Sequence, residues 1–134
     1  MYSVSTKVKL HYTDAAGVMF FGNYFKLIHD AYEDFLDSCG FNLGDVIDKS
    51  DYLILIVHSE ADYRQPVRAG QSVNINMAVD KIKNSSFVLN YVITNEKEKK
   101  IANLQTVHVA IDKSNGKKIS LPAELRIQLE RHVG

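Results

Sequence analysis

The sequence predicts an α+β fold in which one antiparallel sheet wraps around a single long helix. Several segments alternate apolar and polar residues with the period of two that is typical of a strand. One segment, residues 24–39, instead repeats its apolar residues every three or four positions, as a helix with a broad buried face does. Because the later strands follow one another through short turns, antiparallel pairing is favoured. Nothing but this sheet is long enough to cover the helix.

The first strand is predicted over residues 4–12, in which every second residue faces the core: Val4, Thr6, Val8, Leu10 and Tyr12. The long helix follows, and Gly40 is well placed to end it because glycine readily adopts the left-handed conformation. A polar stretch, residues 41–52, has room for a short helical turn.

Four strands are predicted after the helix. The first runs from Leu53 to Tyr63 and ends near Pro66, since proline cannot donate to a strand ladder. The other three cover residues 73–79, 87–93 and 104–111, and turn signals separate them. Pro122 is placed to open a short final helix that runs through Glu130.

Length and composition limit the possible functions. The 134 residues predict a single domain over 1–134, and 46% hydrophobic residues can build a core. Sixteen basic and sixteen acidic residues cancel, which argues against nucleic-acid binding. Cys39 is the only cysteine, so no intrachain disulfide can form, which suits the cytoplasm. We expect neither a signal peptide nor a membrane span.

Asp14 is the most informative residue. It lies at the predicted end of the first strand, and two alanines, Gly17 and Val18 separate it from the long apolar helix. An aspartate before a helix is usually a cap or turn residue. A carboxylate held beside the unpaired N–H groups of a helix N-terminus can, however, also perform acyl transfer.

The surrounding residues resemble the hotdog-fold thioesterases of the 4-hydroxybenzoyl-CoA thioesterase type. The resemblance covers essentially the whole chain and is most specific in Tyr-Thr-Asp-Ala-Ala-Gly-Val at 12–18, with Phe-Phe-Gly-Asn-Tyr-Phe at 20–25. The segments 61–70 and 121–122 also match. Within the family, the stretches 29–33, 57–59 and 105–109 are most similar to the 1,4-dihydroxy-2-naphthoyl-CoA hydrolases of menaquinone and phylloquinone biosynthesis.

The resemblance implies a cytoplasmic enzyme that hydrolyses an acyl-CoA or aroyl-CoA thioester. Asp14 would attack the carbonyl or activate water, and the Phe21 backbone N–H would bind the oxyanion. Gly17 and Val18 would lie against the substrate, Gly17 by allowing close backbone approach. His58 is the first choice for a pocket contact. The nucleotide end of coenzyme A would meet one strand turn: Lys81, Lys83, Ser85 and Ser86. For this turn, an ordinary solvated hairpin is an equally good interpretation.

No metal or separate cofactor is expected, because coenzyme A is part of the substrate and the five histidines lack a metal-binding spacing. The family also implies a homodimer or homotetramer with sites at the junction, since exposed sheet edges are a liability. Three alternatives stay open. They are a short- or medium-chain acyl-CoA thioesterase of the Tol-Pal-associated type, a dehydratase on the same fold, and a non-catalytic acyl-CoA-binding scaffold. The dehydratase would need a histidine base that the Asp14 motif lacks.

Overall fold

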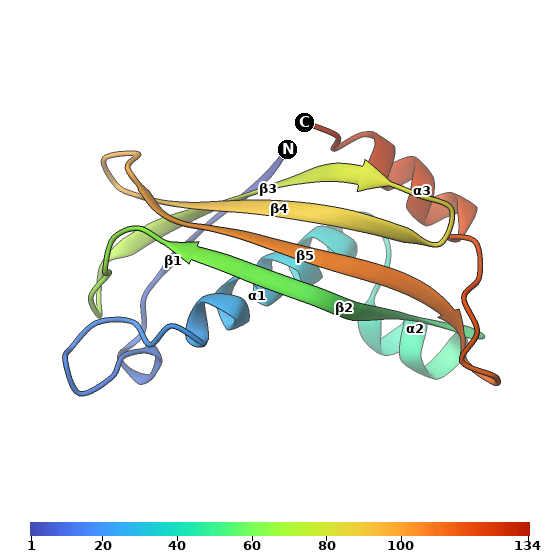
Figure 1. Cartoon of the computed structure of the whole chain (residues 1–134), viewed down its shortest axis with the longest axis horizontal. Coiled ribbons are helices and arrows are strands. Elements are labelled where there is room, and N and C mark those ends of the chain that lie inside the picture. The colour runs from blue at the N-terminus through green and yellow to red at the C-terminus, as the bar shows by residue number, and fades with distance from the viewer.

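The computed structural model describes all 134 residues and is built around one five-stranded antiparallel sheet (Figure 1). The spatial order of the strands is β1-β3-β4-β5-β2, so β1 and β2 form the two edges. The strands are β1 (Tyr2–Lys7), β2 (Tyr52–Tyr63), β3 (Ser72–Ile82), β4 (Ser86–Asn95) and β5 (Lys100–Asp112). All four neighbouring pairs are antiparallel. Short turns join the strands of two of these pairs, β3–β4 and β4–β5, as the sequence predicts.

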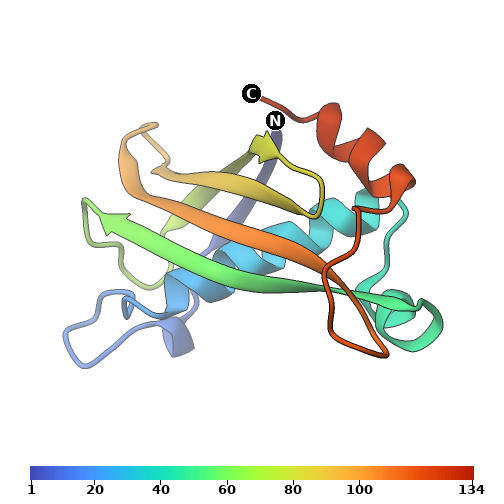
Figure 2. The same ribbon diagram turned by 45° about the vertical axis from the view of Figure 1, so that its right-hand side comes forward.

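The long helix α1 (Asn23–Ser38) lies on one side of this sheet, which curves around it (Figure 2). Two short helices, α2 (Leu43–Lys49) and α3 (Ala123–Glu130), lie near one end of the sheet (Figure 1). Gly40 has a φ of +86°, and the N–H of Phe41 bonds back to Leu36, so α1 ends where the sequence predicts. The α+β architecture with a sheet around one helix is confirmed.

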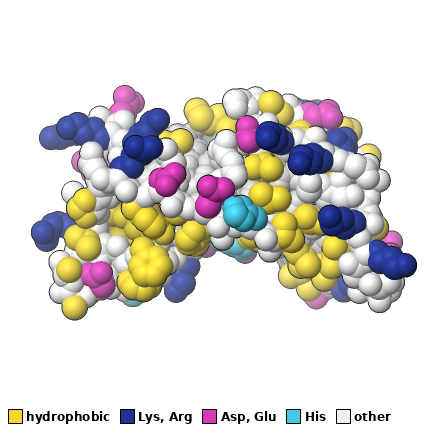
Figure 3. Space-filling view, in the orientation of Figure 1, with side chains coloured by type: hydrophobic (Ala, Val, Ile, Leu, Met, Phe, Trp, Pro, Cys, Tyr) yellow, Lys and Arg dark blue, Asp and Glu magenta, His cyan; other side chains and the backbone are white.

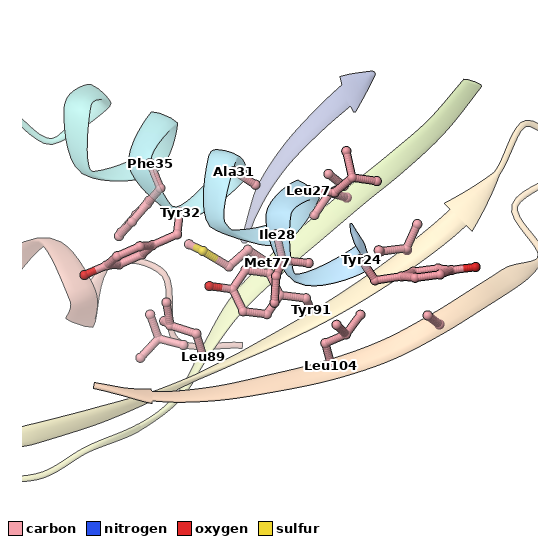
Figure 4. Close-up of a cluster of buried hydrophobic side chains, with 14 of the residues drawn as sticks. Tyr24, Leu27, Ile28, Ala31, Tyr32, Phe35, Met77, Leu89, Tyr91 and Leu104 are labelled. Carbon is pink, nitrogen blue, oxygen red and sulfur yellow. The ribbon is translucent and has the colours of Figure 1, made fainter. Parts of the chain in front are cut away.

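The core lies between α1 and the inward-facing residues of the sheet (Figure 4). Helical spacing places one α1 face against the strands: Tyr24, Leu27, Ile28, Ala31, Tyr32, Phe35 and Leu36. Alternation along β3 and β4 supplies the opposing side chains: Val73, Ile75, Met77, Val79, Phe87, Leu89, Tyr91 and Ile93.

The first strand is shorter than the sequence suggests. β1 ends at Lys7, which pairs with Ser72 at the start of β3, and Leu10–Tyr12 forms a 3₁₀ turn. The alternation of apolar and polar residues continues beyond Lys7. The partner strand β3 does not reach that far, because the chain turns at Gly70, just before Ser72, with a φ of +86°. Leu10 is consequently 79% exposed instead of buried.

The remaining predicted elements are present. Helices and strands start or end within a few residues of the expected positions, and β5 begins earlier than expected, at Lys100. Ile101 and Ala102 extend the buried face of β5. The sequence does not predict this, because these two residues directly follow a run of charged residues. None of the helices is both long and apolar enough to cross a membrane.

Candidate active site

Asp14 sits at the first position of a tight turn that projects from the body of the molecule (Figure 1). The N–H of Gly17 bonds to the Asp14 carbonyl at 3.0 Å, and the Asp14 N–H bonds to the Val18 carbonyl at 2.9 Å. One carboxylate oxygen of Asp14 accepts the Ala16 N–H at 2.8 Å. This local bond orients the carboxylate and leaves its second oxygen free of a protein partner.

The turn is fastened to the start of α1 by one carbonyl. The Tyr12 carbonyl accepts hydrogen bonds from the Phe20 N–H and from the Asn23 side-chain amide, both at 2.9 Å. Asn23 is the first residue of α1, so the segment that carries Asp14 is held directly at the helix N-terminus.

The N-terminus of α1 has unpaired hydrogen-bond donors. Gly22 precedes the helix and offers no side chain for a cap, and the N–H groups of Phe21 and Gly22 meet no acceptor within the chain. The Tyr63 hydroxyl donates to the Phe21 carbonyl at 2.9 Å, which holds the peptide that carries the Gly22 N–H, next to the peptide that carries the Phe21 N–H. Free N–H groups at the positive end of a helix suit an oxyanion.

Glycine at position 17 is explained by backbone conformation. Its φ is +79°, which other residues rarely adopt. An added Cβ would come no closer than 3.8 Å to another part of the chain, the Arg68 guanidinium. Crowding within one chain therefore does not require glycine here. The neighbouring Val18 is half-buried and pairs with Arg68 through an isolated antiparallel bridge.

A depression of about 360 Å³ lies beside these donors, with Phe21, Tyr24 and Tyr63 in its wall. The Tyr24 and Tyr63 rings contact each other edge-on at 4.9 Å between centroids. Phe21 thus lies in the wall of this depression, and Asp14, Gly17 and Val18 lie in the turn that the Tyr12 carbonyl holds at the start of the same helix. This arrangement can position a thioester near a carboxylate and unpaired N–H groups.

His58 lies elsewhere, in the middle of β2. It pairs with Val107, whereas its neighbour Ser59 pairs with the buried Thr106, so His58 is directed to the face away from α1. Its Nε2 is 3.1 Å from a Glu60 carboxylate oxygen on the same face. Within one chain, His58 therefore does not join the segment that carries Asp14.

The four residues expected near the nucleotide also lie apart from Asp14. They occupy the β3–β4 turn, at the end of the sheet opposite the Asp14 turn (Figure 1). The Lys83 N–H bonds to the Ser86 carbonyl at 2.7 Å, and the Ser85 carbonyl accepts the Ala110 N–H at 2.9 Å. Lys81 and Lys83 are exposed, so they are accessible to an anionic group.

One group of buried polar residues was not singled out as a site from the sequence: Tyr32, Tyr91, Thr106 and His108. His108 is 1% exposed, and burial together with the charge of His29 lowers the pKa of its imidazole to about 3. Burial likewise raises the pKa values of Tyr32 and Tyr91 above the usual tyrosine range. The alternation Leu104, Thr106, His108 was a signal that two polar residues face inward, but it does not show what they meet.

Comparison with known proteins gives consistent matches over nearly the whole chain. The profile of the thioesterase-like superfamily matches residues 8–129. A 1,4-dihydroxy-2-naphthoyl-CoA hydrolase from Crocosphaera subtropica is 35% identical over 111 residues, covering 81% of each chain. The hydrolase of the same name from Nostoc punctiforme is 33% identical over 129 residues, covering 96% of this chain and 86% of the relative.

A solved structure agrees as well. The crystal structure of a 1,4-dihydroxy-2-naphthoyl-CoA thioesterase from Synechocystis superposes with a TM-score of 0.92 at 29% identity, covering 96% of this chain and 94% of that chain. The resemblance that the Asp14 segment indicates is thereby confirmed. The chain belongs to the thioesterase-like superfamily and has its hotdog fold.

Proposed function

We propose that this protein hydrolyses the thioester of 1,4-dihydroxy-2-naphthoyl-CoA, a step in quinone biosynthesis, and that Asp14 is its catalytic carboxylate. The main support for the mechanism is the position of the Asp14 turn. Hydrogen bonds to the Tyr12 carbonyl hold this turn at the N-terminus of α1, where N–H groups are unpaired. The choice of acyl group is supported by the names of the relatives that cover most of this chain.

The reaction has two routes that use the same groups. In one, an Asp14 oxygen bonds to the thioester carbon, the C–S bond breaks, coenzyme A leaves as a thiolate, and water then hydrolyses the mixed anhydride. In the other, Asp14 takes a proton from a water molecule whose oxygen attacks the carbon directly. Both routes place negative charge on the carbonyl oxygen, and the Phe21 N–H stabilises it.

The leaving group explains why so few residues suffice. An alkyl thiol has a pKa of ~8.5, so the thiolate departs without a strong general acid. A carboxylate and a pair of N–H donors therefore provide the attack and the charge stabilisation that thioester hydrolysis needs.

We infer that the complete site includes a second copy of the chain. Asp14 is exposed here, and the residues expected to meet the nucleotide, Lys81 to Ser86, lie at the end of the sheet opposite the Asp14 turn (Figure 1). β2 is an edge strand that exposes Leu55, Ile56 and Val57, and apolar side chains are frequent along that lower edge in Figure 3. Pairing of two β2 edges would cover them. We also infer a cytoplasmic location, since the single Cys39 suits a reducing compartment.

Thiol release by the purified protein tests the proposal. The panel contains 1,4-dihydroxy-2-naphthoyl-CoA, 4-hydroxybenzoyl-CoA, phenylacetyl-CoA and straight-chain acyl-CoA esters, and each is run with Asp14→Asn. We expect the naphthoyl ester to be preferred and the variant to lose about 10²- to 10⁴-fold in kcat/KM. Asp48→Asn is the matched control, because Asp48 is exposed on α2 and has no side-chain partner.

Other outcomes would change the assignment. A preference for a straight-chain ester that still depends on Asp14 keeps the mechanism and discards the naphthoyl substrate. Equal activity in Asp14→Asn and Asp48→Asn would remove Asp14 from the chemistry. Binding of the esters without thiol release would point to an acyl-CoA-binding scaffold.

A further inference from the structure

The chain makes a tight turn between Phe20 and Asn23, immediately before α1. The Asn23 N–H bonds to the Phe20 carbonyl at 2.9 Å, and Gly22 has a φ of −68° and a ψ of −23°. These angles make it a type I turn, because a type II turn needs a positive φ at the third residue. Its two central residues, Phe21 and Gly22, are therefore both helical in conformation. Their N–H groups point in the same direction, as the free N–H groups of a first helical turn do.

The Gly22 N–H belongs to the same peptide group as the Phe21 carbonyl, to which the Tyr63 hydroxyl donates at 2.9 Å. A trans peptide group is planar, so its C=O and N–H bonds point in opposite directions. Tyr63 therefore sets the direction of the Gly22 N–H by holding the carbonyl at the other side of the peptide. A hydrogen bond at the carbonyl also polarises the peptide group, which makes its N–H a stronger donor.

No other hydrogen bond within the chain orients this peptide group. The Phe25 N–H bonds to the Gly22 carbonyl, so the helix supplies no N–H to the Phe21 carbonyl. The Gly22 N–H has no acceptor in the chain. Packing holds the group only weakly, since the Phe21 side chain is 62% exposed. The Tyr63 hydroxyl is consequently the one hydrogen-bonding partner that fixes the peptide.

Tyr63 is itself firmly placed. It is the last residue of β2 and pairs with Ala102 of the neighbouring strand β5. Its ring contacts the buried Tyr24 edge-on, with centroids 4.9 Å apart, and lies edge-on to Phe21 at 6.5 Å. The hydroxyl therefore ties the turn before α1 to the sheet, and a group held in this way is oriented before a substrate arrives.

We propose that the Gly22 N–H is a second donor to the thioester carbonyl oxygen, beside the Phe21 N–H, and that Tyr63 is the residue that positions it. This inference rests on the proposed function and deepens it. When the new C–O bond forms, an electron pair of the carbonyl moves onto its oxygen, and it returns when the C–S bond breaks. The two N–H groups share that charge, and Tyr63 acts on it only through the peptide.

Tyr63→Phe removes the hydroxyl and keeps the ring. We expect kcat to fall about 3- to 10-fold, with KM within about twofold of the wild-type value, because the lost interaction strengthens only in the transition state. Tyr2→Phe is the matched control. Tyr2 lies on β1 and packs on Phe35 in the last turns of α1, and its hydroxyl makes no hydrogen bond in the chain. We expect this control to keep the wild-type kcat.

A double-mutant cycle tests whether Tyr63 acts through the Gly22 N–H. Gly22→Pro removes that N–H, and the φ of −68° is the value that a proline ring holds. We expect a loss of about 10²-fold in kcat, and no further loss when Tyr63→Phe is added, because its target is already absent. Effects that multiply would overturn the proposal.

A spectroscopic measurement keeps the test decisive if Gly22→Pro does not fold, since proline also restricts the preceding Phe21. The probe is 1,4-dihydroxy-2-naphthoyl-CoA with carbon-13 at the thioester carbonyl, bound to Asp14→Asn protein. Hydrogen bonds to a carbonyl oxygen lower its stretching frequency in the infrared. We expect the band to move to higher frequency when Tyr63→Phe is added to Asp14→Asn, and to stay in place when Tyr2→Phe is added.

These readouts separate this inference from the proposed hydrolysis. If the wild-type protein hydrolyses no ester but the carbonyl band still moves with Tyr63→Phe, the hydrolysis proposal fails and the assignment of the donor stands. If hydrolysis depends on Asp14 while Tyr63→Phe changes neither kcat nor the carbonyl band, the proposed function stands and this inference is wrong.

Discussion

Replacement of His108 by phenylalanine should change how the stability of the protein depends on pH. In the folded chain the pKa of His108 is lowered to about 3, chiefly by burial and secondarily by His29. The groups around the ring are Tyr32 and His29 of α1, Phe87 and Tyr91 of β4, and Thr106 of β5. None of them is a carboxylate that would stabilise an imidazolium.

The sign of the effect follows from proton linkage. An unfolded histidine has a pKa of ~6.5, so between about pH 6.5 and about pH 3 the unfolded chain binds a proton that the folded chain does not. His108 therefore contributes its full stability above pH 6.5, and this contribution is lost as the pH falls toward the folded pKa. For pKa values of 6.5 and about 3, the loss between pH 8 and pH 5 is RT ln[(1 + 10^1.5)/(1 + 10^−2)], or about 2 kcal/mol.

Urea unfolding at several pH values measures this quantity. The carboxylates titrate in both proteins, so the difference between wild type and His108→Phe isolates the histidine. We expect the wild-type free energy of unfolding to fall by about 2 kcal/mol more than that of the variant between pH 8 and pH 5. Parallel pH curves for the two proteins would mean that His108 is readily protonated in the folded state, and the description of a neutral buried ring would be wrong.

Two other substitutions test the arrangement of the site. Tyr63→Phe removes the hydroxyl that holds the Phe21–Gly22 peptide, next to the Phe21 N–H, so we expect kcat/KM to fall several-fold with a loss of about 1 kcal/mol in unfolding free energy. Unchanged kinetics would show that other contacts hold this part of the chain. Val57→Lys places a charge in the exposed apolar edge of β2, and we expect sedimentation to show a shift from oligomer to monomer with loss of activity. A wild-type mass for that variant would locate the contact between copies at another surface.

Most of the fold could be predicted from the sequence because two periodicities determine it. The helical spacing between Tyr24 and Cys39 and the alternation in the later strands place inside most of the side chains that the structure buries, although Phe25 and Cys39 of the helix stripe are only partly buried. The extra strand length expected between Val8 and Tyr12 was wrong for a non-local reason. A strand needs a neighbour, and β3 begins too late in the chain to pair with these residues.

The candidate site could be predicted from the sequence only where one short segment contains its residues. Asp14, Gly17, Val18 and Phe21 lie close together in the chain, and the Tyr12 carbonyl holds them at the start of α1. The small cavity of about 150 Å³ under α1, where Tyr32, Thr106 and His108 lie, is different, because its polar groups come from α1, β2, β4 and β5. Their meeting depends on strand order and register, including the irregularity between Ile56 and His58 that turns Ser59 inward and His58 outward.

The separation of these two groups of residues has a consequence for how the substrate range can diverge. The proposed catalytic carboxylate Asp14 and the proposed oxyanion donor Phe21 lie on one continuous segment, whereas the small cavity under α1 is lined by later parts of the chain. Substitutions at Phe25, Ile56 or Ser59 would reshape this cavity without touching the Tyr12 carbonyl that holds the proposed catalytic segment. Duplicated copies of such a gene could therefore acquire different acyl groups through a few changes, while thioester cleavage is inherited intact.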